Sequence, residues 1–163
     1  MVKVSRAIKW LVIILAPLMM FGCKSAKNQA NLEVAELSLS MKLPSGWEAD
    51  RQNPRIFSET KNRDDNFGMV EDYPLEGKSL KEYVDYMLPA GAPERIISKN
   101  PVTVSGHEAI ETVSEAEYTV IDVNILHSDR VVRVSFRTRK EDFPKYEASL
   151  RASLQSIKFG GSR

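Results

Sequence analysis

The sequence has a single cysteine, Cys23, and only two histidines among its 163 residues. One cysteine excludes an internal disulfide bond and any metal cage made of thiolates. The chain also lacks a glycine-rich phosphate loop, a Gly-x-Ser-x-Gly nucleophile elbow and a His-Glu-x-x-His zinc motif. Without an activated nucleophile or an acid–base pair, the sequence predicts a protein that is not an enzyme and has no cofactor.

The sequence has no excess of charge of either sign, with 23 lysines and arginines against 22 aspartates and glutamates. Binding to nucleic acid would require a strongly basic face, so no nucleic-acid partner is predicted. The chain is 42% hydrophobic and 28% charged, which is typical of a folded domain. Its length suits one domain better than two.

No apolar run reaches the roughly 20 residues that a membrane-spanning helix requires. The longest is the twelve-residue run from Trp10 to Phe21. Three basic residues (Lys3, Arg6 and Lys9) precede this run, and Gly22-Cys23 follows it. A basic flank, a short apolar core and a small residue at the cleavage site are typical of a secretory signal peptide.

The end of this segment, Met20-Phe21-Gly22-Cys23, resembles a bacterial lipoprotein signal, in which a small residue precedes a cysteine that is acylated. The alternative is an uncleaved anchor with an incidental cysteine. Because the only cysteine occupies the one position that lipidation requires, we expect residues 1–22 to be removed and Cys23 to bind membrane lipid. Each buried methylene of an acyl chain adds about 0.8 kcal/mol of membrane affinity.

The remaining chain is expected to comprise a lipidated N-terminus and flexible tether (residues 23–36) and one globular domain (residues 37–163). It would carry 20 basic and 22 acidic side chains, because three basic residues lie before Cys23. Lys24 stands where an aspartate often retains lipoproteins at the inner membrane. By this resemblance we expect the outer membrane, facing the periplasm, in a Gram-negative cell and the outer face of the plasma membrane otherwise.

Alternation of apolar and polar residues predicts the strands of the domain. Residues 37–43 alternate strictly, and residues 55–61 and 67–73 are further candidates. The strongest signal runs from Glu117 to Thr138, with Ser128-Asp129 as the two-residue loop of a hairpin. All pairs on one face of this hairpin are then apolar: Ile125 with Val132, Val123 with Val134, and Ile121 with Phe136. The pairs on the other face are polar: Asn124 with Arg133, and Asp122 with Ser135.

Two helices are predicted. Ser79 and Glu82 fit a capping box ahead of an apolar stripe that ends near Leu88. The second helix begins at Asp142, a candidate cap, and ends near Gly160-Gly161. Its apolar side chains share one face: Phe143, Tyr146, Leu150, Leu154 and Ile157. Strands, a helix, antiparallel strands and a second helix indicate an α+β domain with an antiparallel β-sheet and helices packed on it.

These features together resemble the PsbP-like fold. They are the strand leading into Leu43-Pro44-x-Gly46-Trp47, the capped helix at Ser79, the long meander, and the closing helix from Phe143-Pro144-x-Tyr146 to Ser156-Ile157-Lys158-Phe159. The resemblance covers about residues 37–159 and implies an αβα sandwich. That family includes photosystem II accessory proteins, chaperones of type VI secretion effectors and small bacterial lipoproteins of the DcrB type, which this chain resembles more. Its members mostly bind other proteins, which implies a non-catalytic interaction or accessory module in the cell envelope, with an envelope protein as partner.

Arginines supply the best candidate for a recognition surface. Arg133, Arg137 and Arg139 form a row beside Asp122, and arginine makes planar bidentate contacts that are enriched at interfaces. The alternative is a solvated or helix-covered face with local ion pairs. Trp47 is a further candidate for protein binding, with a plug in the core as its alternative.

The two histidines support a hypothesis of another class, a small-ligand or metal-binding envelope lipoprotein. It requires His107 or His127 to converge with acids such as Glu108 or Asp129 in a concave site. Each histidine lies beside a predicted turn, and nothing in their spacing requires them to meet, so no metal site is predicted. An interaction module predicts instead an exposed patch on the sheet or at its edge.

Overall fold

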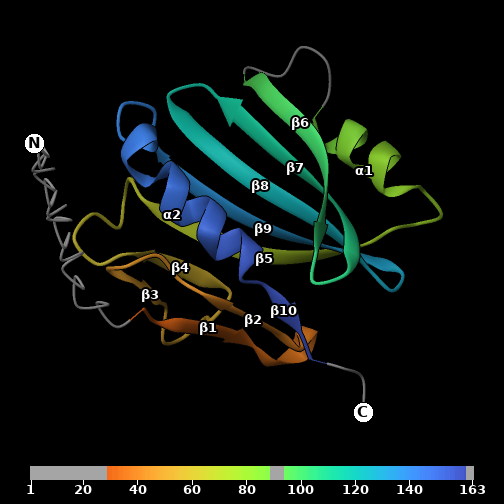
Figure 1. Cartoon of the computed structure of the whole chain (residues 1–163), viewed down its shortest axis with the longest axis horizontal. Coiled ribbons are helices and arrows are strands. Elements are labelled where there is room, and N and C mark those ends of the chain that lie inside the picture. Colours follow the sequence, from red (N-terminus) through yellow and green to blue (C-terminus); the bar gives the residue numbers. More distant parts are fainter. Residues whose placement is uncertain (1–28, 89–93, 161–163) are drawn as a thin grey trace, which may run out of the picture.

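A computed structural model of the chain describes residues 29–88 and 94–160 (Figure 1). The strands are β1 (Asn31–Val34), β2 (Leu39–Lys42), β3 (Trp47–Ala49), β4 (Ile56–Glu59), β5 (Phe67–Pro74), β6 (Arg95–Val104), β7 (His107–Glu115), β8 (Tyr118–His127), β9 (Arg130–Arg139) and β10 (Lys158–Phe159). The helices are α1 (Leu80–Met87), α2 (Phe143–Gln155) and the short 3₁₀ helix η1 (Ala35–Leu37). None of the helices in these ranges is long and apolar enough to cross a membrane.

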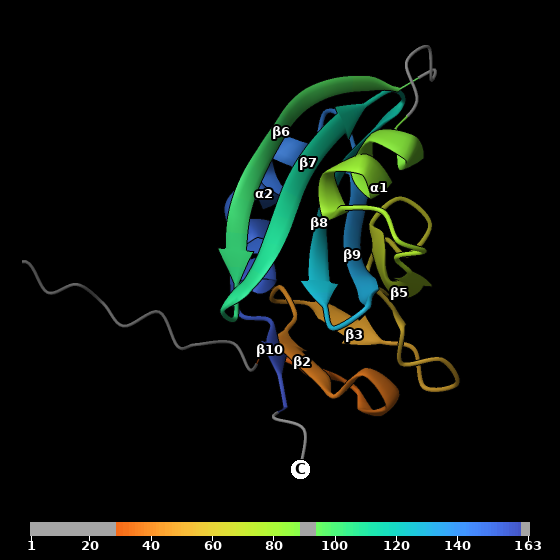
Figure 2. The same ribbon diagram turned by 90° about the vertical axis from the view of Figure 1, so that its right-hand side faces the viewer.

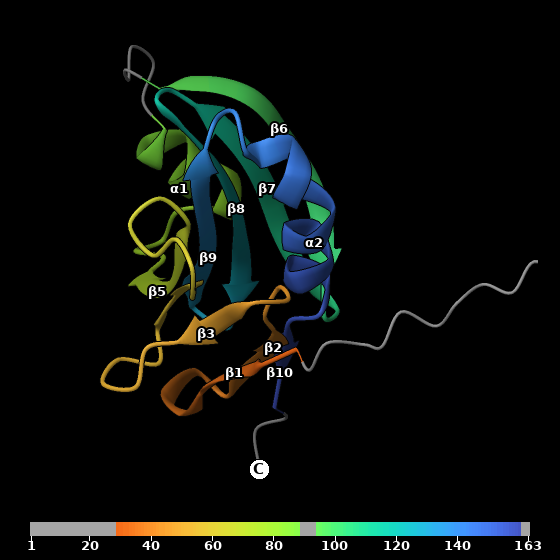
Figure 3. The same ribbon diagram turned by 90° about the vertical axis from the view of Figure 1, so that its left-hand side faces the viewer.

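The strands form two antiparallel sheets. The large sheet has seven strands in the order β3-β4-β5-β9-β8-β7-β6, and the small sheet has the order β1-β2-β10. The two side views show α1 and α2 on opposite faces of the large sheet, with the small sheet at one end of it (Figures 2 and 3). The predicted α+β fold, with helices packed on an antiparallel sheet, is confirmed.

The face of the large sheet under α2 holds the larger core. Its fully buried side chains come from every layer: Leu32 and Leu39 from the small sheet, Val134 and Phe136 from β9, and Leu150 from α2. Trp47, Phe57 and Phe136 pack there with ring centroids 5.1 to 6.3 Å apart. Burying one large apolar side chain contributes about 1.5–3 kcal/mol, so this face is the main source of stability.

The opposite face is covered only in part, by α1. The capping box forms as predicted, because the Glu82 N–H donates to Ser79 Oγ at 3.2 Å and the Ser79 N–H donates to the Glu82 carboxylate at 2.7 Å. Three buried side chains of α1 (Leu80, Tyr83 and Val84) pack with Ile110 and Val131 in a second, smaller core. With eight residues, the helix is too short to cover the whole face.

The central hairpin has the predicted register. Ile125 pairs with Val132, Ile121 pairs with Phe136, and the polar pairs also form as expected. His127 pairs with Arg130, so Ser128 and Asp129 are the two loop residues. The apolar side chains therefore point into the main core, and the polar ones lie on the face that α1 leaves partly open.

Part of the segment predicted as a flexible tether (residues 23–36) has regular structure. Residues 31–34 form β1, in which Leu32 and Val34 are fully buried against β2. Two apolar positions are too few to reveal this alternation in the sequence. The strand expected at residues 37–43 begins only at Leu39, because η1 separates β1 from β2.

The end of the chain also differs from the prediction. Asp142 makes no side-chain capping hydrogen bond, and Pro144 lies in the first turn of α2 instead. The helix ends at Gln155, and β10 then pairs with β2. The Gly160 N–H donates to the carbonyl of Ser38 at 2.6 Å, so the chain is held to the small sheet as far as Gly160; Gly161 lies outside the described residues.

Candidate functional site on the open sheet face

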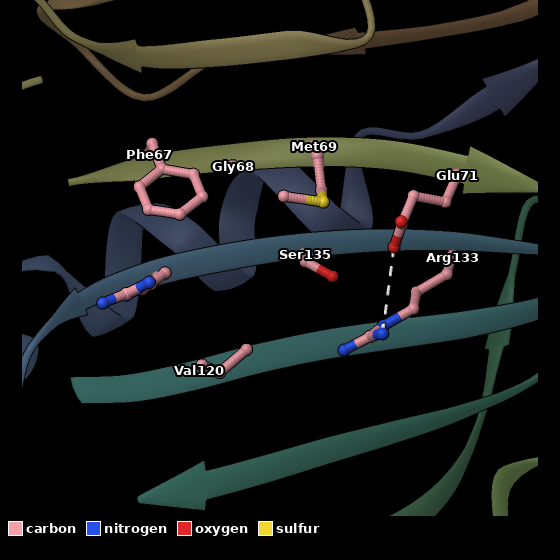
Figure 4. A pocket seen from close by; sticks show the side chains of 8 residues that line it. Phe67, Gly68, Met69, Glu71, Val120, Arg133 and Ser135 are labelled. Atoms are coloured by element: carbon pink, nitrogen blue, oxygen red, sulfur yellow. Dashed lines mark ion pairs between the residues drawn. The ribbon is translucent and has the colours of Figure 1, made fainter. Parts of the chain in front are cut away.

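The part of the large sheet that α1 leaves uncovered contains a hollow of about 270 Å³. Its lining comes from three adjacent strands, β5, β9 and β8 (Figure 4). We call it the open-face hollow, and its residues are Phe67, Gly68, Met69, Glu71, Val120, Arg133, Ser135 and Arg137. A second hollow of about 360 Å³ shares Met69 and Glu71 with it and extends to Ile56 at the rim.

Arg133 and Asp122 form a partly buried ion pair in the floor of this face. Arg133 Nε–H donates to Asp122 Oδ1 at 3.2 Å, and Nη2–H donates to Oδ2 at 3.0 Å. The Asp122 carboxylate also accepts hydrogen bonds from the hydroxyls of Ser135 and Thr112. Its side chain is 4% exposed, against 25% for Arg133. The guanidinium therefore lies over a carboxylate that is satisfied from several sides.

The charge of Arg133 is neutralised within the protein. Burial lowers the pKa of Arg133, but the carboxylate of Asp122 and then that of Glu71 outweigh this effect, and the pKa is raised. Glu71 Oε2 lies 3.8 Å from Arg133 Nη1 (Figure 4). Burial and then the hydrogen bond with Glu71 raise the pKa of Tyr73 to about 12. Arg133 is thus a structural cation of the sheet.

Arg137 has a different environment. Its guanidinium carbon lies 3.5 Å from the centroid of the Tyr118 ring and 5.2 Å from that of Phe67. Within residues 29–88 and 94–160, no carboxylate forms an ion pair with Arg137, and its buried Nε finds no hydrogen-bond acceptor. The rest of the chain contains no aspartate or glutamate. Stacking on aromatic rings, rather than an acidic partner, positions this cation.

The other two candidates lie outside the hollow. Arg139 donates from Nε to Asp65 at 2.8 Å, and this hydrogen bond raises the pKa of Arg139. Trp47 is 1% exposed and belongs to the main core, so its ring is not on a surface that a partner could reach. Of the five candidates in the domain, Asp122 therefore pairs with Arg133, and Arg133 and Arg137 line the same hollow.

Sequence reasoning missed the β5 side of the hollow. Phe67 pairs with Arg137 and Glu71 pairs with Arg133, but β5 and β9 are far apart in the sequence and no local pattern indicates that they are neighbours. Tyr118 could have been found. The predicted hairpin register, extended by three pairs beyond Ile121 and Phe136, places Tyr118 opposite Arg139 and therefore diagonal to Arg137.

The structure brings the two histidines together, which their spacing did not predict. The ring centroids of His107 and His127 lie 4.9 Å apart, and His127 stacks on Phe159 at 4.2 Å. Burial, and then the charge of His107, lower the pKa of His127. The described part of the chain contains no group of three or more histidine, cysteine or acidic residues that could hold a metal. Convergence with acids, which the metal hypothesis requires, is therefore not seen in that part.

Among known proteins, neither a family model nor a curated protein matches this chain. The fold does match solved structures. Cyanobacterial PsbP from Synechocystis aligns with a TM-score of 0.59 and 10% identity, over 89% of this chain and 100% of that one. This chain has the PsbP-like fold.

Two further structures align with the PsbP-like domain equally well. A protein of unknown function from Pseudomonas aeruginosa, described as a putative regulator, has a TM-score of 0.59 and 13% identity, over 83% of this chain and 99% of that one. LpqN of Mycobacterium tuberculosis, described as involved in cell envelope biogenesis, has a TM-score of 0.59 and 8% identity, over 82% and 86%. Such low identities establish the fold alone, and the closer likeness to lipoproteins of the DcrB type stays a prediction.

Proposed function

We propose that this protein is a lipid-anchored, non-catalytic docking module of the cell envelope, and that its open sheet face binds an envelope protein. The observation that carries the proposal is the open-face hollow. It exposes phenylalanine, methionine and arginine side chains, which are residue types enriched in protein–protein interfaces. The floor beneath them is held rigid by the Arg133–Asp122 pair, so the surface is formed before a partner arrives.

The position of the hollow on an open sheet surface favours a protein partner over a small ligand. Sites for drug-sized ligands typically measure about 300–1,000 Å³ and enclose most of the ligand. The open-face hollow has about 270 Å³ and lies on an open sheet surface, which suits one or two inserted side chains. The adjoining hollow toward Ile56 extends the surface along which a partner would lie.

The proposed anchor fits this orientation. From Cys23 to the start of β1 at Asn31 the chain has eight residue steps, which span at most about 28 Å. β1 belongs to the small sheet, at the end of the molecule away from α1 (Figures 1 and 2). A lipid on Cys23 would therefore hold the small sheet near the membrane. The description of LpqN as involved in cell envelope biogenesis supports the same setting.

Photo-crosslinking in cells tests the docking face. A photoreactive residue replaces Ile56, which is 42% exposed and pairs with Met69, so that it lies at the rim without filling the hollow. The matched control carries the same residue at Ala152, on the exposed side of α2. We expect one reproducible envelope-protein adduct from position 56 and none from position 152. Equal adducts from both positions, or none from position 56, would contradict the proposal.

The lipid anchor has its own test. Cys23→Ser should abolish labelling with a radioactive or clickable fatty acid and release the protein from membranes, because the thiol is the attachment point. The control is a serine substitution at Ala26, three residues further along the tether, which should leave both properties unchanged. A Cys23→Ser protein that stays in the membrane fraction would indicate an uncleaved apolar anchor instead.

A further inference from the structure

We propose that Arg137 is the specificity-determining residue of the open face, and that it binds a carboxylate presented by the partner beside an apolar side chain. The inference rests on the proposed docking function, since it names the chemistry by which that face selects its partner. The ligand it implies is an acidic peptide segment, with glutamate or aspartate next to a residue such as leucine or phenylalanine.

Arg137 differs from the other arginines of the same strand. β9 carries four, and three of them have an acidic partner within the chain. Arg130 pairs with Asp72, Arg133 with Asp122, and Arg139 with Asp65. Arg137 has none among the described residues. Because Arg137 lines the hollow without an acidic partner of its own, its charge is complementary to an anionic group from outside.

Two aromatic rings fix the orientation of the Arg137 guanidinium. Tyr118 and Phe67 contact it by their ring faces, and the Nε is buried without an acceptor. Holding an arginine in one place costs side-chain entropy, which here is lost before any ligand binds. The terminal nitrogens are the part left to meet a ligand, and their planar fork matches the two oxygens of a carboxylate.

Apolar side chains surround the Arg137 guanidinium. Phe67 and Val120 are the direct cross-strand neighbours of Arg137, one on each side. Met69 is the next residue of β5 on this face, and it pairs with Ser135. An anion at Arg137 would therefore have apolar side chains beside it, so the partner's residue next to the acid is expected to be apolar. A free inorganic anion has no apolar group that could pack against these side chains.

The neighbouring cation does not compete for the same ligand. Arg133 already donates two hydrogen bonds to Asp122, and Glu71 adds a second carboxylate beside it. An anion placed over Arg133 would meet Glu71, the one acid that lines the hollow. Repulsion from Glu71 directs a carboxylate toward the Arg137 end of the hollow. A ligand would therefore bind in one direction along β5.

Peptide arrays test the inference. The full-length lipoprotein, solubilised in detergent, is applied to immobilised peptides in matched pairs that differ only by glutamate or glutamine next to leucine. We expect the acidic member of each pair to bind at least tenfold better, and added salt to reduce the difference. Arg137→Gln should remove the preference. Arg139→Gln, the control from the same strand, should keep it, because Arg139 lies outside the hollow and is paired with Asp65.

Two further measurements separate recognition from folding. Arg137→Lys keeps the charge and should retain part of the preference, while the thermal midpoints of all three variants are followed beside wild type. Equal binding of acidic and amide peptides by wild type would overturn the inference, as would an equal loss from Arg139→Gln. In cells, an adduct at position 56 that Arg137→Gln leaves undiminished would overturn the anion site and keep the docking function. No adduct in wild type would overturn both.

Discussion

The two faces of the large sheet are built from the same strands but have opposite chemistry. On β9, Val134 and Phe136 point into the core under α2 and are fully buried, whereas Arg133 and Arg137 alternate with them on the open face. One face is closed by a helix and the small sheet, and the other is closed only in part by α1. The covered face therefore holds the fold together, and the open face is the one on which we propose that recognition takes place.

The sharpest test of this division is a truncation on the covered face. Phe136→Ala removes a fully buried ring that contacts both Trp47 and Phe57. We expect the free energy of unfolding to fall by about 3–5 kcal/mol, because the side chain is lost and a cavity remains. Urea unfolding followed by tryptophan fluorescence measures it. A loss below about 1 kcal/mol would contradict the assignment of the main core to this face.

A second substitution tests a residue of the open face that contributes to stability. Asp122 lies on the open side, yet its carboxylate is buried under Arg133 and accepts from Ser135 and Thr112. Asp122→Ala should cost about 2 kcal/mol, less than the 3–5 kcal/mol typical of a broken buried pair, because Arg133 remains partly in contact with water. The comparison variant is Arg139→Ala at an exposed pair, where a much smaller loss than that from Asp122→Ala is expected because solvent screens the charges.

Replacing Arg137 should affect partner binding more than stability, whereas replacing Asp122 should mainly lower stability. Arg137→Gln loses its stacking on Tyr118 and Phe67, and we expect less than about 1 kcal/mol of destabilisation from this. The same variant is expected to lose the partner. A large loss of stability from Arg137→Gln, comparable with that from Asp122→Ala, would make Arg137 a structural residue and would remove the contrast between the two cations.

The smallest predicted effect is a dependence of stability on pH. Burial and then His107 lower the pKa of His127 below its ordinary value of 6.5. The unfolded chain then binds more protons than the folded one, so stability falls as the pH drops through about 6.5 and levels off below the folded pKa. Urea midpoints between about pH 7.5 and 5.5 should show this in wild type. The dependence should weaken in His127→Gln, and a dependence unchanged in that variant would contradict the assignment.

The sequence predicts the local part of this fold well and its long-range pairing poorly. The register from Tyr118 to Arg139 follows from alternation around a two-residue loop, and the cap at Ser79 follows from one short motif. β1 and β10 are too short to have a periodicity of their own and form only because β2 lies between them.

The same limit applies to the candidate site. Asp122, Arg133 and Arg137 were found because they share one face of a predictable hairpin. Phe67, Met69 and Glu71 were not, because the neighbour of β9 on its other side is set by tertiary packing. Likewise, His107 begins β7 and His127 ends β8, and the two rings come into contact only when these strands pack beside Phe159 of β10.

The most direct test of the account is the ratio of crosslinked adducts from positions 56 and 152 in cells that express the anchored protein at equal levels. The account predicts that position 56, beside the open-face hollow, yields a single envelope-protein adduct and that position 152, on the outer side of α2, yields none. Adducts of equal yield, or adducts from position 152 alone, would contradict the claim that the open face is the docking surface.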